Sequence, residues 1–262
     1  MEPWRTAIST SDDEHIWIRG YDITQLMTSA TFADVVFLLH KGRLPSESER
    51  RIVDAVLIAV ADHGPGSPSA VAARTVATGN RVAPEAAIAA GVLAIGDAHG
   101  GAGLACLQLI ADAMTRVRTS GTSVAAVARD VVEEARAAHR RLPGIGHRTH
   151  TRDPRTEVLF DLARAGGIAG DGIAFMLELE RAAVEAIKPL PINVDGALAA
   201  ILYDLGFPPP VGKLFFIIGR VAGLSAQVLE EYTRERAMRV KVPVTYDGPA
   251  PRELGDAIKV GR

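Results

Sequence analysis

Four of the seven histidines lie beside glycine or proline at expected helix boundaries, namely His63, His99, His147 and, less cleanly, His150. A core histidine usually lies in the middle of a helix on an apolar face, whereas a boundary histidine more often lines a cleft. The imidazole ring titrates near neutral pH and can donate or accept a proton. His63, His99 and His147 are therefore candidates for acid–base chemistry, beside the alternative that they only pack.

A carboxylate and two guanidinium groups complete the set of candidates. Asp195 follows a proline-rich loop and begins an apolar run, which suits a general base, although Asn193 or Asp195 could equally be the N-cap of that helix. Arg155 falls in the first turn of a helix that Asp153-Pro154 opens. Arg220 lies in an apolar helix, where a buried cation needs a partner, and guanidinium groups match carboxylates in a bidentate manner. Together these residues indicate a small polycarboxylate and proton transfer at carbon.

Other kinds of site have little support in the sequence. The histidines are far apart and form no His-x-x-x-His pair with a glutamate on the same helical face, so we expect no metal. No Gly-x-Ser-x-Gly motif is present, which argues against a Ser-His-Asp triad. The glycine-rich stretch 100–103 follows no strand and is not a dinucleotide fingerprint. A single cysteine, Cys106, excludes a disulfide within the chain.

The bulk properties narrow the class of protein. The chain has 262 residues, is 48% hydrophobic and carries a formal net charge of −2, which argues against nucleic acid as a partner. The N-terminus lacks the apolar run of a signal peptide, and no run of about twenty residues is apolar without charge. We therefore expect a cytoplasmic protein that does not span a membrane.

The elements that must position these groups are predicted to be helices. Residues 1–30 read as irregular apart from a short strand at 16–20, and the tail from Lys241 is expected to wrap irregularly over a neighbouring surface. Ten helices follow from apolar spacing, caps, glycines and prolines. Their predicted ranges are 31–39, 46–60, 69–78, 84–94, 104–118, 123–141, 154–165, 171–187, 193–205 and 211–232. The fold class is therefore all-α.

The loop before His147 is built for close approach to a ligand. Pro143 fixes φ, while Gly144 and Gly146 permit backbone conformations closed to other residues. We expect this loop to present unpaired backbone N–H groups to a bound molecule.

Five segments resemble landmarks of the citrate synthase superfamily, in that family's order. They are Ala61-Asp62-His63, His99-Gly100-Gly101-Ala102, Gly144-Ile145-Gly146-His147-Arg148 with Asp153-Pro154-Arg155, Asn193-Val194-Asp195, and Gly219-Arg220-Val221-Ala222-Gly223. One such motif would be weak, but five in order are a specific signal. The resemblance covers most of the chain.

The resemblance implies roles for the candidate residues. Asp195 would exchange a proton with the α-carbon of an acyl-CoA, and His99 would hydrogen-bond the thioester oxygen as its enolate forms. His147 would serve the carbonyl or hydroxyl oxygen of an oxo acid. The residues that would hold carboxylates are His63, Arg155, Arg220 and Lys241. Coenzyme A, a substrate rather than a permanently bound cofactor, would contact Leu142, Pro143, Gly144, Ile145, Gly146 and Lys188.

Details of the sequence favour one branch of this family. The chain resembles stand-alone citryl-CoA lyases and the C-terminal lyase module of ATP-citrate lyase in its length and in the stretches 5–9 and 41–45. It also resembles them in having Gly64 after His63, where citrate synthases usually have glutamate. In contrast, His99 and Asp153-Pro154-Arg155 are similar to citrate synthases. Lys241-Val242-Pro243 stands where synthases have Arg-Pro-Arg, which leaves the second carboxylate clamp open.

The expected activity is therefore a citryl-CoA lyase that forms acetyl-CoA and oxaloacetate. The alternatives are a citrate synthase, a lyase for citramalyl-CoA or another 3-hydroxy-acyl-CoA, and a non-catalytic acyl-CoA-binding protein. The resemblance also implies a large helical domain from residues 1–102 and 207–262, a small domain from 103–206, and a homodimer or dimer of dimers.

Overall fold

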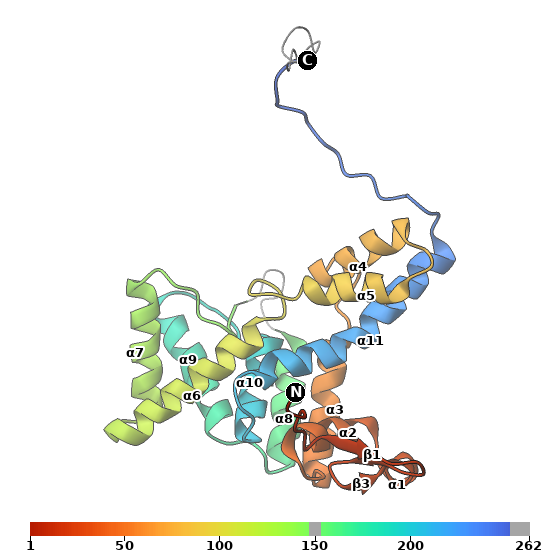
Figure 1. The fold of residues 1–262 in the computed structure, drawn as a ribbon. Coiled ribbons are helices and arrows are strands. Elements are labelled where there is room, and N and C mark those ends of the chain that lie inside the picture. The colour runs from red at the N-terminus through yellow and green to blue at the C-terminus, as the bar shows by residue number, and fades with distance from the viewer. Residues whose placement is uncertain (147–152, 252–262) are drawn as a thin grey trace.

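The computed structural model describes residues 1–146 and 153–251, and within them the chain is all-α with a small N-terminal sheet (Figure 1). This confirms the predicted fold class. The helices are α1 (Ile23–Ser29), α2 (Phe32–Lys41), α3 (Glu47–Ala61), α4 (Pro68–Gly79), α5 (Pro84–Leu93), α6 (Ala102–Ser120), α7 (Val124–Ala137), α8 (Pro154–Ala165), α9 (Asp171–Ala186), α10 (Val194–Asp204) and α11 (Val211–Arg234).

Local signals in the sequence set most helix boundaries. Thr31 and Ser46 each form a capping box, at the start of α2 and α3 respectively. Gly42 ends α2 with φ of 77°, a left-handed conformation that glycine adopts without steric cost. Pro154 occupies the first turn of α8 behind the cap Asp153. These ends agree with the predicted ones to within a few residues.

Two groups of helices pack against the long helix α11. Helices α6, α7, α9 and α10 pack against one another, while α4 and α5 pack together against α11. Helix α11 also contacts α3, α6 and α10, so it runs from one group to the other (Figure 1). The main apolar core includes Phe37, Phe175 and Phe215, whereas α4 and α5 pack on α11 in a separate small cluster that includes Leu224 and Val228. The division into domains at residues 102 and 206 stays a prediction.

The N-terminal thirty residues are more regular than predicted. Strands β1 (Ser9–Ser11), β2 (Ile16–Ile18) and β3 (Tyr21–Asp22) form an antiparallel meander in which Thr10 pairs with Trp17. Helix α1 follows, with Asp22 as its N-cap. Only Leu26 of α1 is buried, so the sequence lacks the apolar spacing by which a helix of this length could be recognised.

Helix α7 ends four residues before its predicted end. His139 takes the left-handed conformation with φ of 50°, and the amide of Arg140 donates to the carbonyl of Ala135. This is the turn that usually carries glycine after a helix. The sequence offers no glycine there, which is why the boundary was predicted too late.

Helix α11 is the most apolar long helix in the described part of the chain. By length and composition it could cross a membrane, but half of its most apolar window is buried inside the protein. It contacts α3, α4, α5, α6 and α10, as expected for the central helix of a core.

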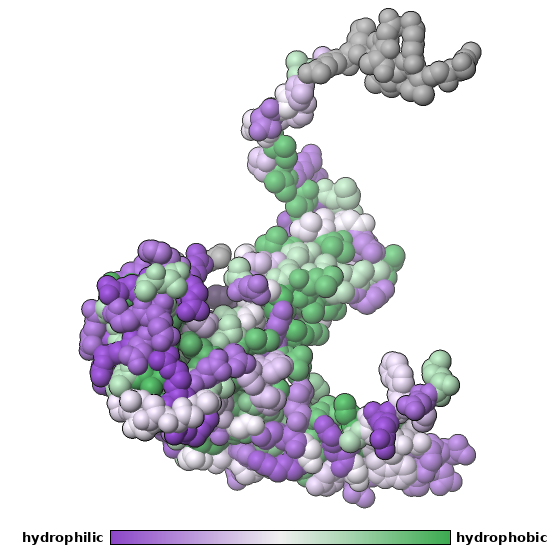
Figure 2. All heavy atoms as spheres, turned by 60° about the vertical axis from the view of Figure 1, so that its left-hand side comes forward, coloured by the Kyte–Doolittle hydropathy of each residue, from purple (hydrophilic) through white to green (hydrophobic). Residues whose placement is uncertain are grey.

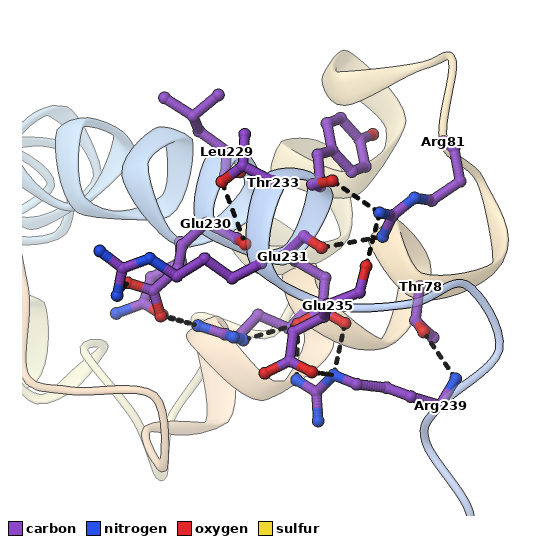
Figure 3. A network of polar contacts seen from close by, with 12 residues as sticks. Thr78, Arg81, Leu229, Glu230, Glu231, Thr233, Glu235 and Arg239 are labelled. Atoms are coloured by element: carbon purple, nitrogen blue, oxygen red, sulfur yellow. Dashed lines mark hydrogen bonds and ion pairs between the residues drawn. The ribbon is translucent and has the colours of Figure 1, made fainter.

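A polar network fixes the point where the tail leaves the helices (Figure 3). Glu231 of α11 is fully buried and accepts hydrogen bonds from Arg239 at 2.6 and 2.8 Å and from Arg74 Nε at 2.9 Å. Arg81 donates to the carbonyls at the end of α11, among them that of Glu235 at 2.8 Å. Two cations around one buried carboxylate compensate its desolvation.

Beyond this network, residues 241–251 are exposed and extend away from the helices (Figure 1). The prediction that the tail wraps over a neighbouring surface is therefore wrong for this chain's own helices. The large apolar side chains of the tail are exposed rather than packed on the helices: Val242 is 74%, Val244 84% and Tyr246 74% exposed.

Candidate active site

A cavity of about 460 Å³ brings together residues that are far apart in the sequence. Its lining includes six of the predicted site residues, His63, His99, Gly146, Arg155, Asp195 and Arg220. They come from the loop after α3, the loop before α6, the loop before α8, and helices α8, α10 and α11. Because proteins gather functional side chains in concave sites, this cavity is the candidate active site.

Asp195 has the environment of an acid–base group. Asn193 is the N-cap of α10, since its Oδ1 accepts from the amide of Gly196 at 3.1 Å, so Asp195 is not needed as a cap. Its Oδ1 atom is buried and accepts no hydrogen bond from any residue that the structure describes. Burial raises the pKa of Asp195 from 3.8 to about 6, against the opposing charges of Arg155 and Arg220. A carboxyl group with this pKa can hold or release a proton near neutral pH.

Ser69 connects His99 to Arg220. The Nη1 atom of Arg220 donates to Ser69 Oγ at 3.2 Å, and this oxygen lies 2.9 Å from Nε2 of His99. A guanidinium group can only donate, so Ser69 accepts from Arg220 and keeps its own hydrogen and a second lone pair for the imidazole. When Ser69 donates to Nε2 of His99, a neutral ring carries its hydrogen on Nδ1. This arrangement suits His99 as a hydrogen-bond donor.

Arg220 is held rigidly in the cavity wall. Its side chain is 2% exposed, its Nε donates to the carbonyl of Val60 at 2.8 Å, and its guanidinium lies 4.8 Å from the ring centre of Phe216. The prediction that this buried cation has partners is confirmed. These partners are neutral groups, and no carboxylate of the described residues forms an ion pair with Arg220.

Arg155 is engaged differently from the prediction. Its Nε and Nη2 atoms form a bidentate pair with Asp153, at 2.9 and 2.8 Å, and Nη1 donates to the carbonyl of Ala59 at 3.1 Å. Asp153 also accepts from the amide of Val194 at 3.0 Å, one residue before Asp195. Arg155 still lines the cavity, but much of its hydrogen-bonding capacity serves to fix the start of α10.

The glycine loop, residues 142–146, is hydrogen-bonded to the segment just before α10. Gly146 donates its amide to the carbonyl of Pro191 at 2.7 Å, and the carbonyl of Gly144 accepts from the amide of Asn193 at 3.1 Å. The expectation of an unpaired amide at Gly146 is therefore wrong. A Cβ atom on Gly196 would collide with the carbonyl oxygen of Gly144, so two glycines bring this loop against α10.

The remaining predicted residues lie elsewhere or outside the described part. His147 belongs to residues 147–152, which the structure does not describe. Leu142 and Pro143 line a second cavity, while Lys188 is exposed just after α9 and Lys241 is exposed in the tail. Neither lysine lines the cavity that contains Asp195.

Sequence reasoning missed two contributors to the site, Ser69 and Phe216. Ser69 is fully buried in the first turn of α4, and Phe216 lies edge-on to His99, with ring centres 6.1 Å apart. A serine after proline at a helix start is common, and a phenylalanine in an apolar helix reads as core. No local signal distinguishes them; only the fold does.

The chemistry available is acid–base catalysis beside a carboxylate-binding cation. In the described residues no group of three histidine, cysteine, aspartate or glutamate side chains is placed to hold a metal ion. A carboxyl group of raised pKa, a histidine donor and an uncancelled guanidinium suit the formation or collapse of an enolate next to a carboxylate.

Comparison with known proteins places this arrangement in context. The family model of the citrate synthase C-terminal domain matches residues 3–51 and 45–241. The structure of citryl-CoA lyase from Hydrogenobacter thermophilus is 39% identical, with a TM-score of 0.88 over 98% of this chain and 100% of that chain. ATP citrate lyase from Methanothrix soehngenii, in complex with citrate and coenzyme A, shares the fold with a TM-score of 0.80 at 22% identity, over 95% of this chain and 43% of that chain.

Curated relatives are longer than this chain. The citrate/2-methylcitrate synthase of Bacillus subtilis is 29% identical over 231 residues, which are 87% of this chain and 59% of the relative. The citrate synthase of Haloferax volcanii is 28% identical, over 87% of this chain and 58% of that protein.

Proposed function

Because the chain belongs to the citrate synthase family, we propose that it is an enzyme that cleaves citryl-CoA into acetyl-CoA and oxaloacetate. The observation that carries this proposal is the likeness to a citryl-CoA lyase over 98% of this chain and 100% of that chain. The cavity around Asp195, His99 and Arg220 supports the proposal with groups suited to the enolate and to a carboxylate of the substrate.

The proposed reaction reverses a condensation. The C3 hydroxyl of citryl-CoA loses its proton, its oxygen electrons form the carbonyl of oxaloacetate, and the adjacent C–C bond breaks. The electron pair of that bond becomes the enolate of acetyl-CoA. Nδ1–H of His99 donates to the enolate oxygen, and the protonated carboxyl group of Asp195 gives its proton to the enolate carbon. The resemblance assigns removal of the hydroxyl proton to His147.

Arg220 is the proposed carboxylate partner in the cavity. Its position is fixed by Val60, Ser69 and Phe216, so little side-chain entropy is lost when a carboxylate binds. His63 and Arg155 line the same cavity and are proposed to bind the other polar groups of the substrate. Lys241 would reach such a site only in another copy of the chain.

One experiment separates this function from its alternatives. Purified protein is supplied with citryl-CoA and, separately, with acetyl-CoA plus oxaloacetate, while free CoA and oxaloacetate are followed. We expect oxaloacetate from citryl-CoA without free CoA. Free CoA from acetyl-CoA and oxaloacetate would instead identify a synthase, and cleavage of citramalyl-CoA alone would identify a different lyase. If the chain binds acyl-CoA but turns over none of these substrates, it is a non-catalytic acyl-CoA-binding protein.

The pKa of Asp195 predicts opposite pH dependences for the two half-reactions. Cleavage needs the protonated carboxyl group, so kcat/KM for citryl-CoA is expected to fall as the pH rises through about 6. Removal of a methyl proton from acetyl-CoA needs the carboxylate, so deuterium exchange into that methyl group should rise through the same pH. Steady-state kinetics measures the pH dependence of cleavage, and NMR measures that of deuterium exchange. If both rates change in the same direction with pH, Asp195 is excluded as the group that both reactions share.

We also propose that the protein is a homodimer or a dimer of dimers through the α4, α5 and α11 group. Helix α5 has only one charged residue among those of its sequence, and it is otherwise apolar or glycine and proline. Two leucines of this group face solvent, since Leu93 at the end of α5 is 85% exposed and Leu229 of α11 is 62% exposed. Figure 2 shows hydrophobic residues gathered on the lobe from which the tail emerges. An exposed apolar area of this kind is typical of an interface.

Substitution of one exposed residue tests the proposed interface. Leu93→Glu should convert the oligomer to monomers in sedimentation velocity, because it buries a charge at the contact. Val158→Glu, an exposed apolar position on α8, is the matched control and should leave the mass unchanged. An intact oligomer with Leu93→Glu would place the interface elsewhere.

The cytoplasm is the proposed location of the reaction. The support is that α11 is a core helix with half of its apolar window buried. Cell fractionation tests this, with activity expected in the soluble fraction and not in the membranes.

A further inference from the structure

One face of α11 carries polar and small residues from the active-site cavity to the root of the tail. Arg220, Gly223, Gln227 and Glu231 recur at intervals of three or four positions, so they lie on the same side of the helix. Arg220 lines the cavity, and Glu231 belongs to the polar network where the tail begins (Figure 3). Eleven positions separate these two residues, which is about 16 Å along a helix. One rigid element therefore joins the two places.

The end of α3 packs closely against this face, just before His63. A Cβ atom on Gly223 would collide with the carbonyl oxygen of Ala61 and with Cβ of Asp62, so glycine permits the close approach. Asp62 Oδ2 accepts from the amide of Gly64 at 2.9 Å, which closes a turn around His63. The position of the Asp62 carboxylate therefore sets the direction of the backbone that carries His63.

Gln227 connects Asp62 to the residues at the tail. Its Nε2 lies 3.4 Å from both carboxylate oxygens of Asp62, and its Oε1 accepts from Nη1 of Arg74 at 2.8 Å. Arg74 also donates to Glu230 at 3.1 Å and, from Nε, to Glu231 at 2.9 Å. Because a guanidinium group only donates and a carboxylate only accepts, these two partners fix the orientation of the Gln227 amide.

Arg239 is the last member of the series, at the point where the tail leaves the helices. Its guanidinium donates to the fully buried Glu231 at 2.6 and 2.8 Å. Without Arg239, this carboxylate would keep only Arg74 as a cation among the described residues, so we expect Arg74 to move toward it and away from Gln227. The series Asp62, Gln227, Arg74, Glu231 and Arg239 is called the tail–cavity network below.

We propose that Gln227 is a positioning residue for His63, and that the tail–cavity network couples the root of the tail to the substrate-binding side of the cavity. The inference rests on the proposed function, because it takes His63 as a group that binds the substrate. Asp62 also acts on Arg220: burial lowers the pKa of that guanidinium, and the charge of Asp62 opposes this effect. Displacement of the Asp62 carboxylate therefore disturbs two groups on this side of the cavity.

Two substitutions of Gln227 test its positioning role. In Gln227→Glu the new carboxylate still accepts from Arg74 but repels Asp62, and Gln227→Leu removes both contacts without adding a charge. Each should raise KM for citryl-CoA about 10-fold while kcat changes less than about 2-fold, because substrate positioning is lost and Asp195 is untouched. Thermal unfolding checks that both variants are folded. A rise in KM with Gln227→Glu alone would indicate only a field effect of the added charge and would overturn the proposal.

A double-mutant cycle tests the coupling to the tail. Arg239→Gln should raise KM about 3-fold in the natural background and should add no further rise to Gln227→Leu, in which the network is already broken. Arg236→Gln is the matched control, because Arg236 is an exposed cation of the same segment outside the network, and it should leave KM unchanged. An Arg239→Gln effect of equal size in both backgrounds would show that the tail acts by another route, and would refute the coupling.

Oxaloacetate binding, measured by calorimetry, reports on the same side of the cavity without turnover. If Gln227→Glu weakens this binding but the natural protein does not cleave citryl-CoA, the proposed reaction fails and the positioning role stands. If citryl-CoA is cleaved, and both KM and oxaloacetate affinity are unchanged in Gln227→Glu, the positioning role fails and the reaction stands. Neither binding nor cleavage by the natural protein would overturn both.

Discussion

The substitution Asp195→Asn is expected to lower the rate of citryl-CoA cleavage by about 10²- to 10⁴-fold. The amide keeps the size and polarity of the carboxyl group but has no transferable proton at neutral pH. The enolate would then have to take its proton from water, and its lifetime in the cavity would favour recombination with the oxo acid. Oxaloacetate release by the purified variant measures the loss.

Binding must be preserved for this result to report on chemistry. The affinity for CoA, measured by calorimetry, should stay within a factor of two or so, because Asp195 lies at the thioester end of the site. Asp97→Asn is the matched control, since Asp97 is exposed in the loop before α6 and does not line the cavity. A fully active Asp195→Asn variant would exclude the proposed proton transfer.

The substitution Arg220→Leu is expected to raise KM for citryl-CoA by about 10²-fold or more, because a buried charged hydrogen bond to the substrate is lost. Leucine also leaves the carbonyl of Val60 and the hydroxyl of Ser69 without their donor. His99 would then lose part of its support, so kcat should fall as well. Steady-state kinetics with citryl-CoA separates the two effects.

A conservative variant distinguishes binding from folding. Arg220→Lys keeps the charge but loses the bidentate fork, so its KM should lie between those of the natural protein and Arg220→Leu. Lys213→Leu removes a cation from the first turn of the same helix, outside the cavity, and should change neither constant. Thermal unfolding checks that each variant is folded. Substrate affinity unchanged in folded Arg220→Leu would remove Arg220 from the substrate site.

Helix positions were predictable where the chain carries caps, prolines or glycines. Ser46, Asp153-Pro154 and Gly42 each mark a boundary that the structure confirms. The sequence was less informative about helix boundaries where a residue adopts a backbone conformation that its type rarely takes. His139 ends α7 in a conformation that is uncommon for residues with a side chain, and α1 has one buried residue from which to recognise it.

The candidate site was predictable from motif order but not in its internal contacts. Residues as distant as His63 and Arg220 line one cavity, as the family resemblance implied. The pairing of Arg155 with Asp153 and the bridge through Ser69 depend on side-chain orientation, which spacing along a helix cannot specify. The role of His147 remains a prediction, because that residue lies outside the described part.

The close contact between the glycine loop and α10 has a consequence for any attempt to change the substrate by directed evolution. Alanine at position 196 would drive its methyl group into the carbonyl oxygen of Gly144, and alanine at 144 would meet Cys106. A library that extends behind the cavity wall to positions 144 and 196 would therefore return glycine at both positions. Variation at these positions is lost, whereas Gly66 lines the cavity and has no heavy atom within 4 Å of an added Cβ. New specificity is best sought from that side.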